Sequence, residues 1–452
     1  MQLKKADLTH GPITKTIFAF AIPLILGIFV QTLFNMADQI VLGQMAGSIA
    51  VASVGACASA INLVISFLSG LSTGVTVLLA RALGARDHTL ARRIIGTALI
   101  ASVLLGTLGA TVGIACARAL LTATKCPSEC FDGALVYITV YYASAPVITL
   151  YNFSSAILRV TGDTQRPLIY MLAAGILNVG LNIALCSVLT QKVAAVAIAT
   201  LASQALGAAL VIVRLGHLKE DYRFSFRHPG FSFGIFGKLL RYGLPSGINN
   251  AFYPIANLQI QANVNSFGTA ATAGYAAAAN LGGLAAAITG GFNQTTVAMV
   301  GQNIGAERPD RVEKSIRRCF LFCALLAESV GITLFLLHRP LLRLYLPDDP
   351  SAVEFGRMYL LYVTAFYGIA AFNNTLASTL NAHGYTIFTA ISTLLSVIAF
   401  RPIWLATVYK QNPDFPTLML CFTVSWMLLF FILSVAFSIV HTRYRHGKLK
   451  KL

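Results

Sequence analysis

The stretch IPLILGIFVQTLFNMADQIVLGQ, residues 22–44, decides the class of this protein. It is mostly apolar and is at least as long as the roughly 20 residues that a helix needs to cross the hydrocarbon core of a membrane. Its polar residues Gln31, Asn35 and Asp38 follow an i, i+4, i+7 spacing, which places them on one face of a helix. The stretch therefore predicts a membrane-spanning helix whose polar face looks into protein or into a water-filled cavity.

The composition extends this interpretation to the whole chain of 452 residues. Hydrophobic types make up 56% and charged types 11%, with a mean hydropathy of +0.73, whereas a soluble domain carries about 25% charged residues. The net charge of +17 does not indicate nucleic acid as a partner, because the basic residues lie between apolar runs and not on one amphipathic face. Soluble enzymes and nucleic-acid-binding modules are excluded as the main class, and a lipid bilayer is the expected surrounding.

Continuous apolar runs of spanning length recur along the sequence. We predict twelve transmembrane helices, at 15–43, 48–80, 94–117, 134–158, 167–190, 193–213, 239–265, 270–301, 315–337, 355–381, 385–409 and 415–440. The runs do not alternate between apolar and polar residues, which favours helices over a β-barrel. The predicted fold class is an all-α polytopic membrane protein.

The distribution of Lys and Arg predicts the orientation. With both termini inside, 25 basic residues lie in the inner segments and span ends, 7 lie in the outer ones, and Arg401 lies within a span. Because cytoplasmic segments carry the excess of positive charge, we expect a multi-pass protein of a bacterial-type plasma (inner) membrane with both termini in the cytoplasm.

The two halves of the sequence repeat at a nearly constant offset. Pro23 and Pro245 are 222 residues apart, and Gly84 and Gly305 are 221 apart, each pair at corresponding places in the span pattern. We therefore predict two pseudo-symmetric six-helix lobes, an N-terminal lobe at 1–213 and a C-terminal lobe at 239–452, joined by a cytoplasmic linker at 214–238. A parallel repeat of this kind is typical of two-lobed transporters, so we expect a substrate cleft and alternating access.

Only two acidic residues, Asp38 and Glu328, fall inside the predicted spans. A charge in the membrane is costly, so each is a functional candidate. Asp38 lies on a polar face, whereas Glu328 has only Ser329 beside it, and its role stays open between snorkelling and pairing with an amide. The repeat partner of Asp38 is Gln259 or Ile260, which do not titrate, so ion coupling is expected in the first lobe.

Other polar and aromatic side chains in the spans either line the cleft or bond across helices. Besides Gln31 and Asn35, the candidates for the cleft are Asn62, Tyr253, Asn257, Gln261, Tyr275 and Tyr367. Tyrosine faces can hold organic cations, although each tyrosine could instead serve packing. Asn178 and Asn182 lie one turn apart in the fifth span and belong to the same open group. A disulfide between Cys126 and Cys130, which flank Pro-Ser-Glu in an outer loop, stays open.

Several stretches together resemble the multidrug and toxic compound extrusion (MATE) transporters of the flippase-like superfamily, over the whole chain. They are IPLILGIFVQTLFNMADQIVLGQMAG at 22–47, LARALGARD at 79–87, LRVTGDTQRP at 158–167, NVGLNIAL at 178–185 and VAAVAIATLASQ at 193–204. The resemblance implies that Asp38 binds the coupling proton or Na⁺, that the helix bends at Pro23, and that Asn182 and Thr200 help to hold the cation. Asn178, one turn before Asn182, is the fourth candidate for this cation site.

The sequence departs from that family where a second acid usually follows the asparagine. Cys186 stands at this position, one turn after Asn182. A tight Na⁺ site needs several hard oxygen ligands, so the missing carboxylate favours H⁺ over Na⁺ as the coupling ion. Beyond a possible Na⁺ at Asp38, no metal and no cofactor is expected.

The sequence thus predicts a secondary antiporter, expected to be monomeric, that exports small and often cationic amphipathic compounds. Two alternatives stay open. A lipid-linked-precursor flippase would favour extra helices and a basic cavity. An intramembrane enzyme would need paired intramembrane acids, a Ser/His pair or a zinc motif, none of which the sequence contains.

Overall fold

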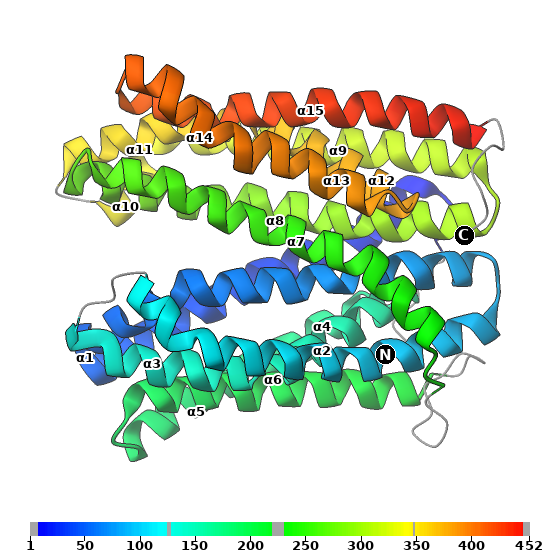
Figure 1. Cartoon of the computed structure of the whole chain (residues 1–452), viewed down its shortest axis with the longest axis horizontal. Coiled ribbons are helices and arrows are strands. Elements are labelled where there is room, and N and C mark those ends of the chain that lie inside the picture. The colour runs from blue at the N-terminus through cyan, green and yellow to red at the C-terminus, as the bar shows by residue number, and fades with distance from the viewer. Residues whose placement is uncertain (1–7, 124–127, 219–229, 347–348, 446–452) are drawn as a thin grey trace. The chain divides into compact units, whose positions relative to one another are not determined.

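The computed structural model describes residues 8–123, 128–218, 230–346 and 349–445, and these residues form helices and short connections without a strand (Figure 1). The first six helices are α1 (Ile13–Gly84), α2 (His88–Ala123), α3 (Ser128–Ala143), α4 (Ala145–Val160), α5 (Gln165–Val188) and α6 (Lys192–Gly216). Next come α7 (Phe233–Asn265), α8 (Thr269–Gly305), α9 (Pro309–Leu336), α10 (His338–Tyr345), α11 (Pro350–Tyr362) and α12 (Tyr367–Ala382). The chain ends with α13 (Thr386–Thr393), α14 (Phe400–Trp404) and α15 (Phe415–Arg445).

The helices agree with the predicted all-α membrane fold. In the described residues, ten helical stretches are long and apolar enough to span a membrane, and eleven if a bent pair counts as one span. Two of them, Ile13–Ala46 and Ala60–Gly84, lie within α1. The remaining predicted span at 239–265 corresponds to α7, whose 33 residues are long enough to span but carry seven Asn and Gln side chains that lower its hydropathy.

The bent pair corresponds to the span predicted at 134–158. Helices α3 and α4 meet at Ser144 with a bend of 44°. Pro146 lies in the first turn of α4, where it has no N–H to continue the hydrogen bonds of α3. Its Cα lies so close to Gly106 of α2 that a Cβ on that glycine would come within 2.5 Å, so the bend is packed against a helix that has no side chain there.

The described residues divide into two compact units, one within 26–251 and the other made of 8–25 with those within 252–445. Helix α1 passes from the second unit to the first between Ile25 and Leu26, and α7 passes back between Ala251 and Phe252. The predicted lobes at 1–213 and 239–452, defined by the sequence repeat, stay a prediction.

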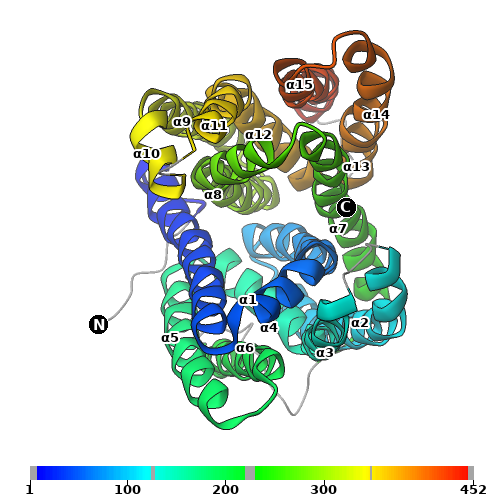
Figure 2. The same ribbon diagram turned by 90° about the vertical axis from the view of Figure 1, so that its left-hand side faces the viewer.

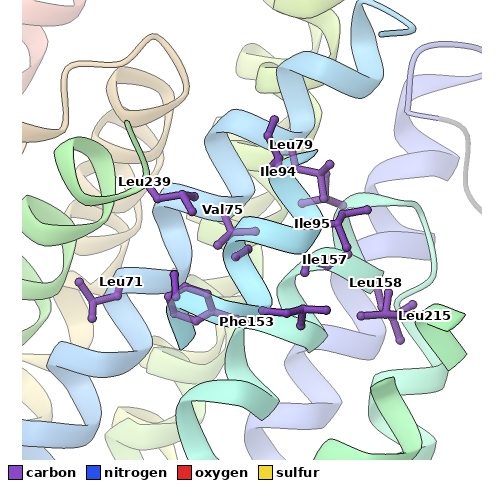
Figure 3. Close-up of a cluster of buried hydrophobic side chains, with 14 of the residues drawn as sticks. Leu71, Val75, Leu79, Ile94, Ile95, Phe153, Ile157, Leu158, Leu215 and Leu239 are labelled. Carbon is purple, nitrogen blue, oxygen red and sulfur yellow. The ribbon is translucent and has the colours of Figure 1, made fainter. Parts of the chain in front are cut away.

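The first unit has an apolar core between α1, α2, α4, α6 and α7. Leu71, Val75 and Leu79 of α1 meet side chains of α2, α4 and α6, and Leu239 of α7 joins them (Figure 3). Backbones of α1 and α7 approach closely here, because a Cβ on Gly74 would lie 2.4 Å from the Leu239 carbonyl oxygen. Such small-residue contacts bring membrane helices together where packing, and not water, drives association.

The second unit packs α8, α9, α11, α12 and α15 side by side, as the end-on view shows (Figure 2). The start of the chain is held in the same unit. The Asn303 side chain donates to the Leu8 carbonyl at 3.0 Å, Arg311 donates to the Gly11 carbonyl at 2.9 Å, and the ring of Phe18 lies 4.9 Å from that of Phe322. The first turns of α1 are therefore fixed to the second unit.

Two stretches of the second unit depart from regular α-helix. A short 3-10 segment, Thr364–Phe366, separates α11 from α12 within the predicted span at 355–381. Two π-helical segments, Leu394–Ala399 and Leu405–Tyr409, flank α14 within the predicted span at 385–409. π-helical turns inside α-helices are rare and often occur at functional sites.

Candidate functional site

Asp38 of α1 lies against two asparagines of α5 in the first unit. The Asn182 Nδ2 donates to the Asp38 Oδ1 at 2.5 Å and to the Asn178 Oδ1 at 3.3 Å. Asn182 is fully buried, Asn178 is 5% exposed and Asp38 is half-buried. The structure thus brings together three of the four residues predicted for the cation site.

The surroundings of Asp38 offer oxygen atoms and hydroxyl groups but no basic partner among its described hydrogen bonds and ion pairs. The Asn182 Oδ1 is buried without a hydrogen-bond partner, and Tyr137 and Tyr141 of α3 lie within electrostatic range of the Asp38 carboxylate. A carboxylate in this setting can take up a proton, which removes its charge, or hold a small cation with help from an amide oxygen.

Thr200 forms a hydrogen bond within its own helix, and Cys186 has a basic neighbour. The Thr200 hydroxyl donates to the Val196 carbonyl of its own helix at 3.0 Å, so its part in the cation site stays a prediction. Cys186 is fully buried one turn after Asn182. Its carbonyl accepts a hydrogen bond from the Lys192 ammonium group, and its Sγ lies 3.7 Å from the Lys192 carbonyl oxygen. A basic group, which the sequence analysis did not use, therefore stands beside the position of the missing acid.

Three residues predicted for the substrate cleft, Gln31, Asn35 and Asn62, are exposed side chains of α1. Exposed amides on membrane-spanning helices favour contact with a water-filled space over contact with lipid. Their role toward a substrate stays a prediction.

The second unit gathers aromatic side chains around one buried guanidinium group. Arg401 of α14 is 1% exposed, its Nη1 donates to the Asn257 Oδ1 at 3.1 Å, and its Cζ lies 4.5 Å from the centre of the Phe422 ring. Tyr253 and Tyr275, which were predicted to line the cleft, lie within electrostatic range of the same group. The protein's own cation therefore lies among the aromatic faces that were expected to attract a cationic substrate.

Of the other predicted cleft residues in the second unit, Tyr367 packs against aromatic rings, as Tyr275 does, whereas Gln261 does not. The Tyr275 ring lies 5.2 Å from that of Tyr359, and the Tyr367 ring lies 5.6 Å from that of Trp426. Gln261 lies further along α7 and donates to the Asn265 Oδ1 at 2.8 Å, a bond within the same helix that does not involve the tyrosines.

Arg401 is the site residue that the sequence analysis left without a role. A signal was available, because it is the single basic residue placed deep within a predicted span. Its aromatic surroundings come from α7, α8 and α15, which are far apart in the sequence, and no local pattern indicated that they meet.

Glu328 pairs with a backbone amide, which favours the second of the two alternatives considered for it, pairing over snorkelling. Its Oε2 accepts a hydrogen bond from the Gly368 N–H at 2.6 Å. Gly368 lies in the first turn of α12, whose N–H groups have no helical partners and favour a negative charge. Both residues line a groove of about 1140 Å³ between α9, α12 and α15, and this groove does not include Arg401 or Asn257.

The possible disulfide between Cys126 and Cys130 stays untested, because Cys126 lies outside the described residues.

Comparison with known proteins gives results that cover both halves of the chain. A family model described as MatE matches residues 23–184 and 245–404. The probable multidrug resistance protein YpnP of Bacillus subtilis is 24% identical over 400 residues, which are 88% of this chain and 89% of that protein. An FAD transporter of Shewanella oneidensis is 24% identical over 386 residues, 83% of this chain and 84% of that protein.

Solved structures show the same fold. A crystal structure of MATE in the bent conformation superposes with a TM-score of 0.86 at 21% identity and covers the whole of both chains. At this identity the likeness concerns the fold alone.

Proposed function

Since the chain belongs to the MatE family of membrane transporters, we propose that it is a secondary active efflux antiporter. It couples the inward movement of H⁺ or Na⁺ to the export of small, often cationic amphipathic compounds by alternating access. The observation that carries the proposal is the intramembrane Asp38, held by the buried amide of Asn182 without a described ion pair. An ionisable group so placed is a functional candidate by default.

The geometry suggests how protonation acts. The Asn182 N–H groups are shared between Asp38 and Asn178. A hydrogen bond to a charged carboxylate is about twice as strong as one between neutral groups. Protonation of Asp38 therefore weakens its bond to α5 and removes the cost of a charge in the membrane. Both changes alter the balance of forces on α1.

Helix α1 is suited to pass this change on. Its first turns are fixed to the second unit, Asp38 bonds within the first unit, and Pro23 lies between them. Proline lacks the N–H that would close the helical bond at its position, so the helix bends there at a lower energy than elsewhere.

We favour H⁺ over Na⁺ as the coupling ion. The site has one carboxylate, and Cys186 with Lys192 beside it takes the place of a second. Two asparagine side chains supply the neighbouring oxygens, and a tight Na⁺ site needs several such ligands.

The names of the relatives support a transported organic molecule. One is called a probable multidrug resistance protein and another an FAD transporter, and these names favour organic compounds of different charge and size as cargo. These relatives are transporters, which favours a transporter over an intramembrane enzyme. A lipid-linked-precursor flippase would require a larger basic cavity, and Arg401 is the one basic side chain placed deep within a span.

We further propose that the protein works as a monomer in a bacterial-type plasma membrane with both termini in the cytoplasm. The multi-pass membrane location follows from the family and the apolar helices, and the orientation rests on the excess of Lys and Arg in the predicted inner segments.

The test is transport in everted membrane vesicles that contain the protein, with ΔpH or ΔNa⁺ imposed separately. A panel of cationic, neutral and acidic dyes is offered, and vesicles without the protein serve as the control. We expect accumulation of at least one dye that depends on ΔpH and collapses with a protonophore. Accumulation driven by ATP alone, or no transport of any dye, would contradict the proposal.

A further inference from the structure

We propose that Arg401, once Asn257 turns aside, binds the acidic group, a carboxylate or a phosphate, of an aromatic compound. The inference rests on the proposed transport function and names a class of substrate for it. It concerns the second unit alone.

Arg401 has an N–H donor that lacks an acceptor in a buried position, where an unsatisfied donor costs free energy. A guanidinium group has five N–H donors. In the described part of the chain, Nη1 donates to Asn257, while Nε is buried without any acceptor. No ion pair to a described carboxylate is present, and the side chain is 1% exposed. A buried, unpaired charge is costly, and an incoming acidic oxygen would relieve that cost.

The position of Arg401 repeats the cation site of the first unit with the opposite charge. Asp38 and Asn182 are 144 residues apart, and so are Asn257 and Arg401. The second pair is displaced from the first by 219 residues, within one helical turn of the offset of the sequence repeat. An acid bonded to an amide in one unit thus corresponds to an amide bonded to a guanidinium in the other. If the first pair handles a cation, the same place in the second suits an anion.

Asn257 connects the buried guanidinium group of Arg401 to the protein surface. The Asn257 side chain is exposed, and its amide oxygen occupies one donor of Arg401. A carboxylate or phosphate oxygen is a stronger acceptor than an amide oxygen, so it can take over this donor while Asn257 turns aside. The backbone is π-helical immediately before and after α14, the helix that carries Arg401.

The surroundings select an aromatic molecule to carry the acid. Phe422 covers one face of the guanidinium, and its ring lies 6.2 Å from Tyr359 and 6.3 Å from Trp426. Aromatic side chains stack on aromatic ligands, and arginine recognises carboxylate and phosphate with paired hydrogen bonds. An organic cation would instead meet the like charge of Arg401.

The experiment uses two ligands that share a ring system and differ in one phosphate, riboflavin 5′-phosphate and riboflavin. Binding to the purified full chain in detergent is followed by quenching of flavin fluorescence. We expect wild type to prefer the phosphorylated compound by roughly tenfold or more. We expect Arg401→Gln to lose this preference while binding of riboflavin changes little. The control is Arg339→Gln, an exposed arginine of α10, which should keep the preference.

A second variant keeps the proposal testable even if Arg401→Gln does not fold. Asn257→Asp places a carboxylate 3.1 Å from Nη1 and gives Arg401 an internal partner. We expect this variant to be at least as stable as wild type to heat but to lose the preference for phosphate. If Arg401 had a purely structural role, the Asn257→Asp variant would be as stable to heat but would keep the preference for phosphate. Asn257→Ala should keep or raise the preference, because it removes the competing acceptor.

Two results would overturn the inference. One is wild type that binds riboflavin and its phosphate equally, and the other is an Asn257→Asp variant that keeps the preference. Transport of the panel of cationic, neutral and acidic dyes under ΔpH, measured with the same variants in everted vesicles, tests the proposed function separately. Its failure together with intact phosphate preference would reject the antiporter and leave the binding site, whereas the reverse outcome would reject the site and leave the antiporter.

Discussion

Pro23 lies three residues before Leu26, the first residue at which α1 belongs to the first compact unit. In α7, Pro245 lies seven residues before Phe252, at which the chain enters the second unit, and Pro254 lies two residues after it. Each helix that passes between the units therefore has proline close to the passage. A helix is most easily bent at proline, so these positions are where bending in α1 and α7 is cheapest.

We expect Pro23→Ala to stiffen α1 and to reduce its response to pH. Proline inside a helix costs about 3 kcal/mol relative to alanine, enough to shift a two-state equilibrium by about a hundredfold. Spin labels at Met45 of α1 and Thr122 of α2, both exposed in the first unit, should change their separation between about pH 5 and about pH 8 in wild type. The change should be much smaller in the variant.

Labels at Thr122 and Val188 provide the control, because neither helix contains the bend and both sites are exposed. Their separation should not depend on pH. An undiminished response of the Met45 pair in Pro23→Ala would show that α1 moves without this proline.

Much of the fold was predictable from the sequence, because a membrane imposes long apolar helices that hydropathy and basic-residue bias reveal. The Asp38 site could be predicted for a related reason, since an acid within an apolar run stands out. Two features could not be predicted from the sequence: the contact of Lys192 with Cys186 and the aromatic cluster around Arg401. They depend on how helices distant in sequence pack, and neither spacing nor composition contains that information. The passage of α1 between the units could not be predicted either, because it depends on which helices pack together.

The Lys192 contact changes the outcome expected for Cys186→Asp. On the sequence alone, this substitution would add an oxygen ligand and make transport sensitive to Na⁺. The structure places the Lys192 ammonium group against the Cys186 carbonyl, so the new carboxylate would pair with lysine. We expect little gain in Na⁺ sensitivity from Cys186→Asp and a clear gain from Cys186→Asp combined with Lys192→Gln.

The measurement is dye uptake into everted vesicles at fixed pH with Na⁺ varied against K⁺, and Lys192→Gln alone is the control. Equal Na⁺ sensitivity in the single and double variants would refute the pairing. Strong Na⁺ dependence of the wild type would refute the preference for H⁺ itself.

Glu328 is expected to stabilise the second unit without taking part in coupling. Glu328→Ala leaves the Gly368 N–H without its acceptor, which should lower the free energy of unfolding by about 1–3 kcal/mol. Glu328→Gln keeps an oxygen acceptor and should cost less. Thermal unfolding in detergent measures both, and ΔpH-driven export by Glu328→Gln should stay close to wild type. Loss of export in a folded Glu328→Gln variant would assign it a coupling role.

A double substitution tests the same contact independently. A Cβ on Gly368 would lie 2.8 Å from the Glu328 Oε2, so Gly368→Ala should destabilise the protein while Glu328 is present. In the Glu328→Ala background the added methyl group should cost much less. Additive effects of the two substitutions would mean that the two groups do not meet.

The central claim is that Asp38 carries the coupling ion. Asp38→Asn removes the titratable group but keeps the size of the side chain and an oxygen that can accept from Asn182. We expect the variant to insert and unfold like wild type, and to lose ΔpH-driven export almost completely. The exposed Asp132→Asn in α3 is the matched control and should transport normally.

The most direct measurement is ΔpH-driven dye export by purified Asp38→Asn in proteoliposomes, beside wild type and Asp132→Asn at equal protein content. The account predicts no export above protein-free liposomes for Asp38→Asn and full export for the other two. Export by Asp38→Asn at the wild-type rate and with the wild-type dependence on ΔpH would contradict it.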